Sequence, residues 1–195
     1  GRDSHDIGLS EREMREVHLV PFRHVIRNYD CQSVMMAYSD YLGVPVAKSR
    51  ELLHSILREE WGFDGFIVSD CGAIGNLTAR KHYTAKDKIE AANQALAAGI
   101  ATNCGDTYND KEVIQAAKDG HINMENLDEV CRTMLRMMFR NELFEKTPNI
   151  NAFLLADHGV VAMGKDPLAA EHTAELVEET AQVAILDKVV EKLGL

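Results

Sequence analysis

Trp61-Gly62-Phe63-Asp64-Gly65-Phe66-Ile67-Val68-Ser69-Asp70 contains a short strand that is preceded by a tight turn and followed by polar groups. The glycines permit the turn, and residues 66–68 form a continuous apolar run typical of a buried strand in a parallel sheet. Ser69 and Asp70 follow at the carboxyl end of this strand, where an α/β barrel places its catalytic groups. Asp70 is therefore a candidate functional residue, and a loop carboxylate that only accepts backbone hydrogen bonds is the alternative.

Helical and strand-like patterns alternate on both sides of this stretch, which predicts an α/β fold with a parallel sheet. Ser10 and Glu13 form a capping box at the start of one helix, and Pro21 indicates a kink or stop in it. The apolar run 33–38 is expected to be a buried strand, and residues 43–45 are expected to be a loop. The further expected helices cover about residues 49–60, 86–98, 110–118 and 124–139, and the further expected strands cover about residues 66–68 and 100–103.

The composition of the chain changes near Pro148. All 11 arginines precede it, whereas residues 148–195 contain 8 acidic residues and 3 lysines. Two apolar runs in this part predict strands at about residues 152–156 and 160–163, and Asp166-Pro167 predicts the start of a long helix that ends near Leu193. We therefore expect two parts, residues 1–147 and residues 148–195.

The charge and the apolar runs restrict the partners of the chain. The net charge of −10 over 195 residues argues against binding to nucleic acid, which depends on clustered lysine and arginine. The apolar runs are too short to span a bilayer, so no membrane partner is expected. Residues 1–5 are not followed by an apolar segment, so we expect no signal peptide in this chain, and its compartment stays open.

The four cysteines are Cys31, Cys71, Cys104 and Cys131, and none of them forms a CxxC pair. A zinc knuckle is therefore not expected. They are either free thiols of the core, or they include one disulfide, for which Cys71–Cys104 is the candidate pair in a secreted protein.

Residues 59–70 resemble the nucleophile-strand signature of glycoside hydrolase family 3, the β-glucosidases and β-xylosidases. Flanking segments resemble the same family in the same order, over about residues 5–147. Asp70-Cys71, followed by His82-Tyr83-Thr84 and Asn103-Cys104-Gly105, is most similar to the β-xylosidase-like branch. The other segments that carry the resemblance are residues 10–17, 19–22, 36–38, 43–45 and 143–145.

This resemblance implies a retaining glycosidase in which Asp70 is the nucleophile and a carbohydrate is the substrate. Such a reaction needs a second carboxyl group about 5 Å away as the acid/base, and no cofactor. In the family, the acid/base and several sugar-binding residues come from other parts of the chain. The resemblance also implies that Met36 and Tyr38 line the sugar subsite, although residues of a strand can equally be core. Ser39 and Ala101 replace the asparagine and the acidic residue usual in the family.

Residues 153–166, with residues 169–170 and 175–181, resemble the C-terminal part of class II sugar-phosphate aldolases and epimerases. The resemblance implies that His158 is a zinc ligand. Zinc needs three or four ligands, and the HxH pair of that family has no counterpart here. A histidine in a hairpin turn is the alternative interpretation of His158.

Three hypotheses for the function follow. The chain is a fragment of a β-xylosidase or β-glucosidase with little activity alone, a non-catalytic chimera of two enzyme fragments, or a zinc-dependent sugar-phosphate aldolase or epimerase. The first is favoured because its resemblance covers most of the chain. It implies a partial TIM-barrel-like sheet, with about three of eight strands, followed by two strands and a long helix. We expect residues 148–195, or a second copy in a homo-oligomer, to cover the exposed sheet edges.

Overall fold

The computed structural model describes residues 4–79, 82–141, 152–155 and 159–162. The chain divides into two units, Gly1–Met137 and Met138–Leu195, which are described separately. The helices of the first unit are α1 (Glu11–Glu13), η1 (Met14–His18), α2 (Val20–Asn28), η2 (Val46–Lys48), η3 (Glu51–Glu60), η4 (Gly75–Leu77), α3 (Lys88–Ala97), α4 (Lys111–Lys118) and most of α5 (Met124–Arg140). Its strands are β1 (Ser33–Met36), β2 (Asp40–Tyr41), β3 (Val44–Pro45), β4 (Phe66–Ser69) and β5 (Ile100–Thr102).

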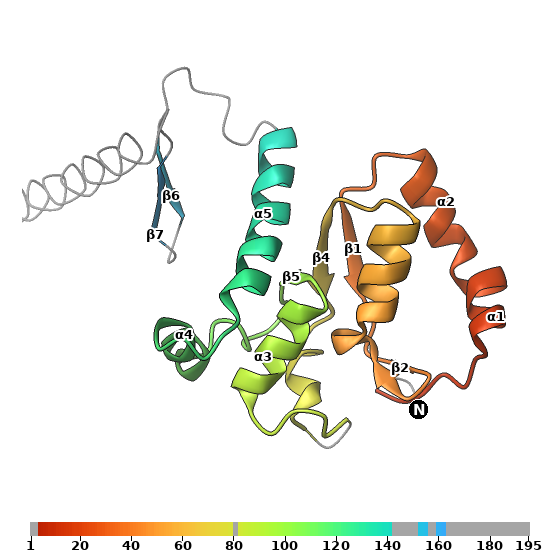
Figure 1. The fold of residues 1–195 in the computed structure, drawn as a ribbon, viewed down its shortest axis with the longest axis horizontal. Coiled ribbons are helices and arrows are strands. Elements are labelled where there is room, and N and C mark those ends of the chain that lie inside the picture. Colours follow the sequence, from red (N-terminus) through yellow and green to blue (C-terminus); the bar gives the residue numbers. More distant parts are fainter. Residues whose placement is uncertain (1–3, 80–81, 142–151, 156–158, 163–195) are drawn as a thin grey trace, which may run out of the picture. The chain divides into compact units, whose positions relative to one another are not determined.

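The sheet that organises the first unit is parallel and has the strand order β1-β4-β5 (Figure 1). Ser33 of β1 pairs with Phe66 of β4, and Met36 pairs with Ser69. On the other side of β4, Ile67 pairs with Ile100 of β5 and Val68 with Thr102. Each strand is connected to the next by helices, as in one section of an α/β barrel. The predicted α/β fold with a parallel, barrel-like sheet is confirmed.

Apolar side chains from the helices and the sheet form the core of this unit. Leu52, Leu53, Ile56 and Leu57 of η3 are buried, as the helical spacing of these residues predicts. They belong to the same core cluster as Ile67, which is fully buried in β4. A second cluster joins α3, α4 and α5 and consists of Ala92, Leu96, Val113, Ala116, Ile122 and Val130.

Arg58 and Gly65 shape the turn that leads into β4. Nη1 of Arg58 donates to the carbonyl oxygen of Gly65 at 3.0 Å, and its guanidinium lies 5.5 Å from the centre of the Phe63 ring. Burial lowers the pKa of Arg58. Gly65 packs directly against the backbone of Gln32, whose carbonyl oxygen accepts from the amide of Phe66 at 3.1 Å. The chain before β1 and the chain before β4 therefore approach each other as closely as glycine allows.

Three details differ from the sequence-based expectations. The predicted buried strand at residues 33–38 is shorter, and Met35 in it is 60% exposed, because its side chain points to the face of β1 opposite the buried Met36. Pro21 does not end a helix but lies in the first turn of α2, where its missing N–H is not needed. Val44 and Pro45 are not a loop, since they form β3, which pairs with β2 in a two-residue hairpin.

The second unit is described only at the end of α5 and in the antiparallel pair β6 (Ala152–Leu155) and β7 (Gly159–Ala162). These strands agree with the two expected there. The predicted long helix and His158 lie outside the described residues. The predicted boundary after residue 147 and the predicted covering of the sheet edges stay predictions.

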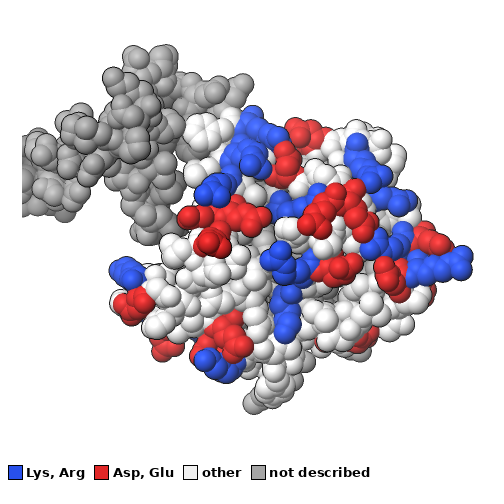
Figure 2. Space-filling view, in the orientation of Figure 1, with Lys and Arg blue, Asp and Glu red and all other residues white. Residues whose placement is uncertain are grey.

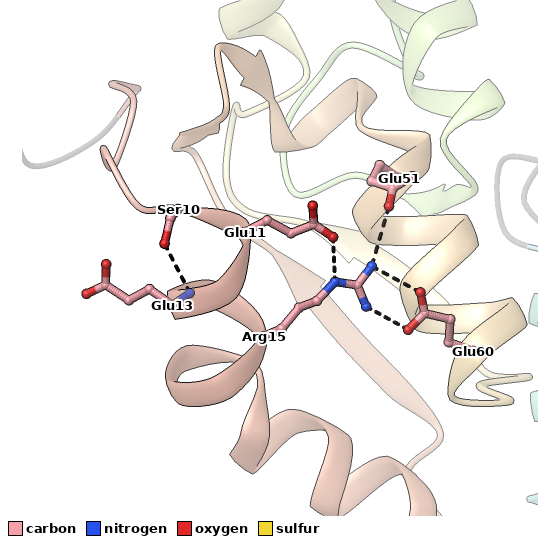
Figure 3. Close-up of polar contacts among 6 residues, drawn as sticks. All are labelled: Ser10, Glu11, Glu13, Arg15, Glu51 and Glu60. Carbon is pink, nitrogen blue, oxygen red and sulfur yellow. Dashed lines mark hydrogen bonds and ion pairs between the residues drawn. The ribbon is translucent and has the colours of Figure 1, made fainter.

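Arg15 connects the first helices to η3 (Figure 3). Its Nη1 and Nη2 atoms donate to the two carboxylate oxygens of Glu60 at 2.7 and 3.0 Å, and its Nε donates to Glu11 at 2.8 Å. Glu51 lies 3.6 Å from Nη2. The bond from Arg15 holds the pKa of Glu60 below its ordinary value. Ser10 begins this region, since its hydroxyl accepts from the amide of Glu13 at 3.2 Å, as the capping box predicts.

The close approach at Gly65 predicts that Gly65→Ala destabilises the chain strongly. The added Cβ would overlap the carbonyl oxygen of Gln32 and lie 2.7 Å from its carbonyl carbon, so the backbone would have to move. We expect a loss of about 3 kcal/mol in the free energy of unfolding, measured by urea titration followed by circular dichroism. Gly75→Ala is the matched control, because its Cβ would meet only the Thr107 hydroxyl, at 3.5 Å. Equal stability of the two variants would contradict this packing.

The Arg15 network predicts a pH-dependent contribution to stability. Arg15→Met should lower the melting temperature at neutral pH more than Arg12→Met, because the ion pair of Arg12 with Glu16 lies on an exposed surface. The pKa of Glu60 is lowered in the folded chain, so its contribution is complete above its ordinary value of 4.5. That contribution is lost as the pH falls through the lowered pKa. Thermal unfolding between pH 7 and pH 3 should therefore show the difference between wild type and Arg15→Met shrinking in acid, and a constant difference would argue against the network.

Candidate functional site

The candidate site lies where the parallel strands end. β1, β4 and β5 run in the same direction, so the segments that follow them meet at one edge of the sheet. These segments are residues 37–40, 70–72 and 103–105. Asp70 follows the central strand β4 and therefore has a neighbouring segment on each side.

Backbone contacts on both sides of Asp70 fix its position. Its amide donates to the carbonyl oxygen of Met36 at 3.3 Å, which extends the pairing of β4 with β1 by one residue. The amide of Cys71 donates to Oδ1 of Asp70 at 2.6 Å. The Asp70 carbonyl accepts from the amide of Ala73 at 3.1 Å. Asp70 is half-buried. The backbone therefore holds one oxygen of a carboxylate that is still partly exposed to solvent.

Two further contacts connect the segment after β4 with its neighbours. The Tyr38 hydroxyl, from the segment after β1, donates to the carbonyl oxygen of Cys71 at 2.5 Å. Cys71 forms a disulfide with Cys104, from the segment after β5. Of the two interpretations of the cysteines, the structure therefore has the disulfide, and Cys31 and Cys131 are free.

A hollow of about 780 Å³ opens beside Asp70. We call it the Asp70 hollow, and its lining includes Phe22, Val25, Met35, Tyr38, Ser39 and Asp70. Asp70 is the only carboxylate among the described residues that line it. Tyr38 and Asp70 are thus brought together. Met36 points elsewhere, since it is 2% exposed and belongs to the core, so its assignment to the sugar subsite stays a prediction.

A buried histidine-aspartate pair joins the segment after β1 to the chain that follows β4, near residue 82. Nδ1 of His82 is 2.8 Å from Oδ1 of Asp40, and the two side chains are 2% and 19% exposed. From the sequence alone, His82 is expected to be a surface residue or a hydrogen-bonded core residue, without a serine or cysteine nucleophile beside it. The signal that could have indicated the pair is that His82 follows β4 and Asp40 follows β1, at the same edge of the sheet.

The described residues give no support to a metal site, because no group of three histidine, cysteine or acidic side chains among them is placed to hold an ion. His158, the predicted zinc ligand, is not among these residues. No helix in the described part of the chain is long and apolar enough to cross a membrane. On the face shown in Figure 2, basic and acidic side chains are interspersed. The expectation that nucleic acid is not a partner stays a prediction.

Curated relatives of the chain are glycosidases. A probable beta-D-xylosidase 6 of Arabidopsis thaliana is 30% identical over 92% of this chain and 22% of the relative. A beta-xylosidase of Formosa agariphila is 45% identical over 47% of this chain and 13% of its own length. A periplasmic beta-glucosidase of Salmonella typhimurium is 32% identical over 74% of this chain and 18% of its own length. The chain thus spans between 13% and 22% of the length of these relatives.

Solved structures of β-glucosidases have the same fold. A β-glucosidase from Erythrobacter marinus matches with a TM-score of 0.67 and 27% identity, over 72% of this chain and 18% of that one. The β-glucosidase from Listeria innocua in complex with glucose matches with a TM-score of 0.64 and 27% identity, over 74% of this chain and 20% of that one.

The resemblance of the last part of the chain to aldolases and epimerases finds no support in these comparisons. The alignment with the Arabidopsis xylosidase covers 92% of the chain, so it takes in most of residues 148–195. The family described as Glycosyl hydrolase family 3 N terminal domain matches residues 1–137, which include every strand of the parallel sheet and Asp70. The chain therefore belongs to glycosyl hydrolase family 3.

Proposed function

We propose that this chain carries the nucleophile of a retaining glycosidase of the β-xylosidase or β-glucosidase type, and that the nucleophile is Asp70. The observation that carries the proposal is the placement of Asp70 at the carboxyl end of the central strand, beside the Asp70 hollow. Its relatives named as xylosidases and glucosidases support the choice of β-xylosides and β-glucosides as the substrate class.

In the proposed reaction, a carboxylate oxygen of Asp70 attacks the anomeric carbon and the bond to the leaving oxygen breaks. The product of this step is a glycosyl ester on Asp70, and water then hydrolyses the ester. The amide of Cys71 holds Oδ1, which leaves Oδ2 as the oxygen that faces the substrate. Tyr38 lines the hollow in which the sugar ring would lie.

The reaction also needs a second carboxyl group about 5 Å from the first, to protonate the leaving oxygen and later to activate water. Asp70 is the only carboxylate among the described lining residues of the hollow, so we assign the acid/base to a part of the protein outside these residues. The described sheet has three strands, whereas a closed barrel of this kind has eight. We therefore expect this chain alone to turn over natural xylosides and glucosides weakly.

An activated 2-fluoro glycoside tests the nucleophile separately from turnover. A good leaving group makes acid assistance less necessary in the first step, so the ester can form without the acid/base, and the 2-fluoro group slows its hydrolysis. We expect slow addition of one glycosyl group to the folded chain, with the added mass located on Asp70 by peptide mass spectrometry. Asp70→Ala should abolish the addition.

Asp119→Ala is the matched control, because Asp119 is an exposed carboxylate at the end of α4 and should leave the labelling unchanged. No label on demonstrably folded protein after long incubation would contradict the proposal. That outcome would favour the non-catalytic scaffold, in which Asp70 is a relic of the family.

A further inference from the structure

We propose that Cys71 is the positioning residue of the nucleophile, and that its disulfide with Cys104 keeps the Asp70 carboxylate in its reactive orientation. The inference rests on the proposed function. It adds that the reactivity of the site depends on an oxidised bond one residue away from the reacting group. Cys71 acts on substrate only through Asp70, so it is not itself catalytic.

Three different groups of Cys71 make three different connections. Its amide donates to Oδ1 of Asp70 at 2.6 Å, and its carbonyl oxygen accepts from the Tyr38 hydroxyl at 2.5 Å. Its sulfur is bonded to Cys104. The carbonyl is therefore tied to the segment after β1 and the side chain to the segment after β5. Between these two ties, the amide holds the carboxylate.

The connection to β5 is reinforced around the disulfide. The amide of Cys104 donates to the buried Ser69 hydroxyl at 3.0 Å, and the amide of Gly72 donates to the Cys104 carbonyl at 2.6 Å. A Cβ on Gly105, whose φ is +142°, would lie 3.1 Å from the amide nitrogen of Gly72. The two segments thus pack backbone to backbone, and a side chain at position 105 would separate them.

The disulfide can be reduced in the folded chain because both cysteines are exposed. A dithiol reductant supplies two electrons and two protons, so the sulfur-sulfur bond breaks, two thiols form, and the reductant becomes its own disulfide. The Tyr38 bond remains, but Cys71 loses its covalent bond to Cys104, and the hydrogen bond from the Gly72 amide to the Cys104 carbonyl is no longer held closed by it. We expect the amide of Cys71 to spend less time bonded to Asp70, and the carboxylate to turn away from its attacking orientation.

The test compares the oxidised chain with the chain reduced by dithiothreitol, and with the double variant Cys71→Ser/Cys104→Ser. Each is kept at a temperature at which circular dichroism shows it folded. The first readout is hydrogen exchange of the Cys71 and Gly72 amides, which does not require any reaction. The second is inactivation by the activated 2-fluoro glycoside, resolved into the limiting rate and the concentration at half-maximal rate.

We expect faster exchange of both amides, and a limiting rate lower by about ten- to a hundredfold with little change in the half-maximal concentration. Tyr38→Phe, which removes only the hydroxyl that holds the Cys71 carbonyl, should show the same pattern with a smaller effect. Cys131→Ser should change neither amide exchange nor the limiting rate, relative to the unsubstituted chain in the same redox state. Cys131 is a free, exposed thiol of α5, so its removal leaves the disulfide intact.

Unchanged exchange of the Cys71 amide after reduction would overturn the inference, whatever happens to labelling. An unchanged limiting rate in a chain that does become labelled would also overturn it while leaving the proposed function intact. If the oxidised chain is never labelled, the proposed function fails and the exchange measurement alone decides whether Cys71 holds Asp70.

Discussion

β4 is hydrogen-bonded to a parallel strand on each side, and the rest of the first unit depends on that arrangement. A parallel strand with two partners must be covered on both faces, which explains its apolar residues and the helices that pack against it. At its start, Gly65 allows the backbone of Gln32 to approach, and Arg58 holds the carbonyl oxygen of Gly65. At its end, the same pairing continues to the amide of Asp70. The position of the carboxylate is thus a consequence of the strand register.

Local sequence patterns were sufficient to predict most of this fold. The apolar run before Ser69, the spacing of the leucines in η3 and the capping box at Ser10 each act within a few residues, so they are visible in the sequence. The exposure of Met35 was not predictable in this way, because it depends on what covers the face of β1 opposite Met36. Pro21 was misinterpreted because a proline that ends one helix and a proline that begins the next follow the same kind of pattern.

The candidate site was predictable only in part, for a related reason. Asp70 could be identified from its place after a strand and from the family signature around it. The contacts of Tyr38 with Cys71 and of His82 with Asp40 join residues 33 and 42 positions apart, and sequence spacing carries no information about such pairs until the strand order is known. The choice between free thiols and a Cys71–Cys104 disulfide was left open by the sequence for the same reason. Each of these contacts becomes understandable once β1, β4 and β5 are neighbours.

The measurement that tests the central role of β4 most directly is native-state hydrogen exchange, resolved residue by residue by NMR. Because β4 has a strand on each side whereas β1 and β5 each have only one in the described sheet, opening β4 requires the whole sheet to open. We predict that the amides of Ile67, Val68 and Ser69 exchange more slowly than those of β1 and β5, and at the rate of global unfolding. Exchange of the β4 amides as fast as in the edge strands would contradict it.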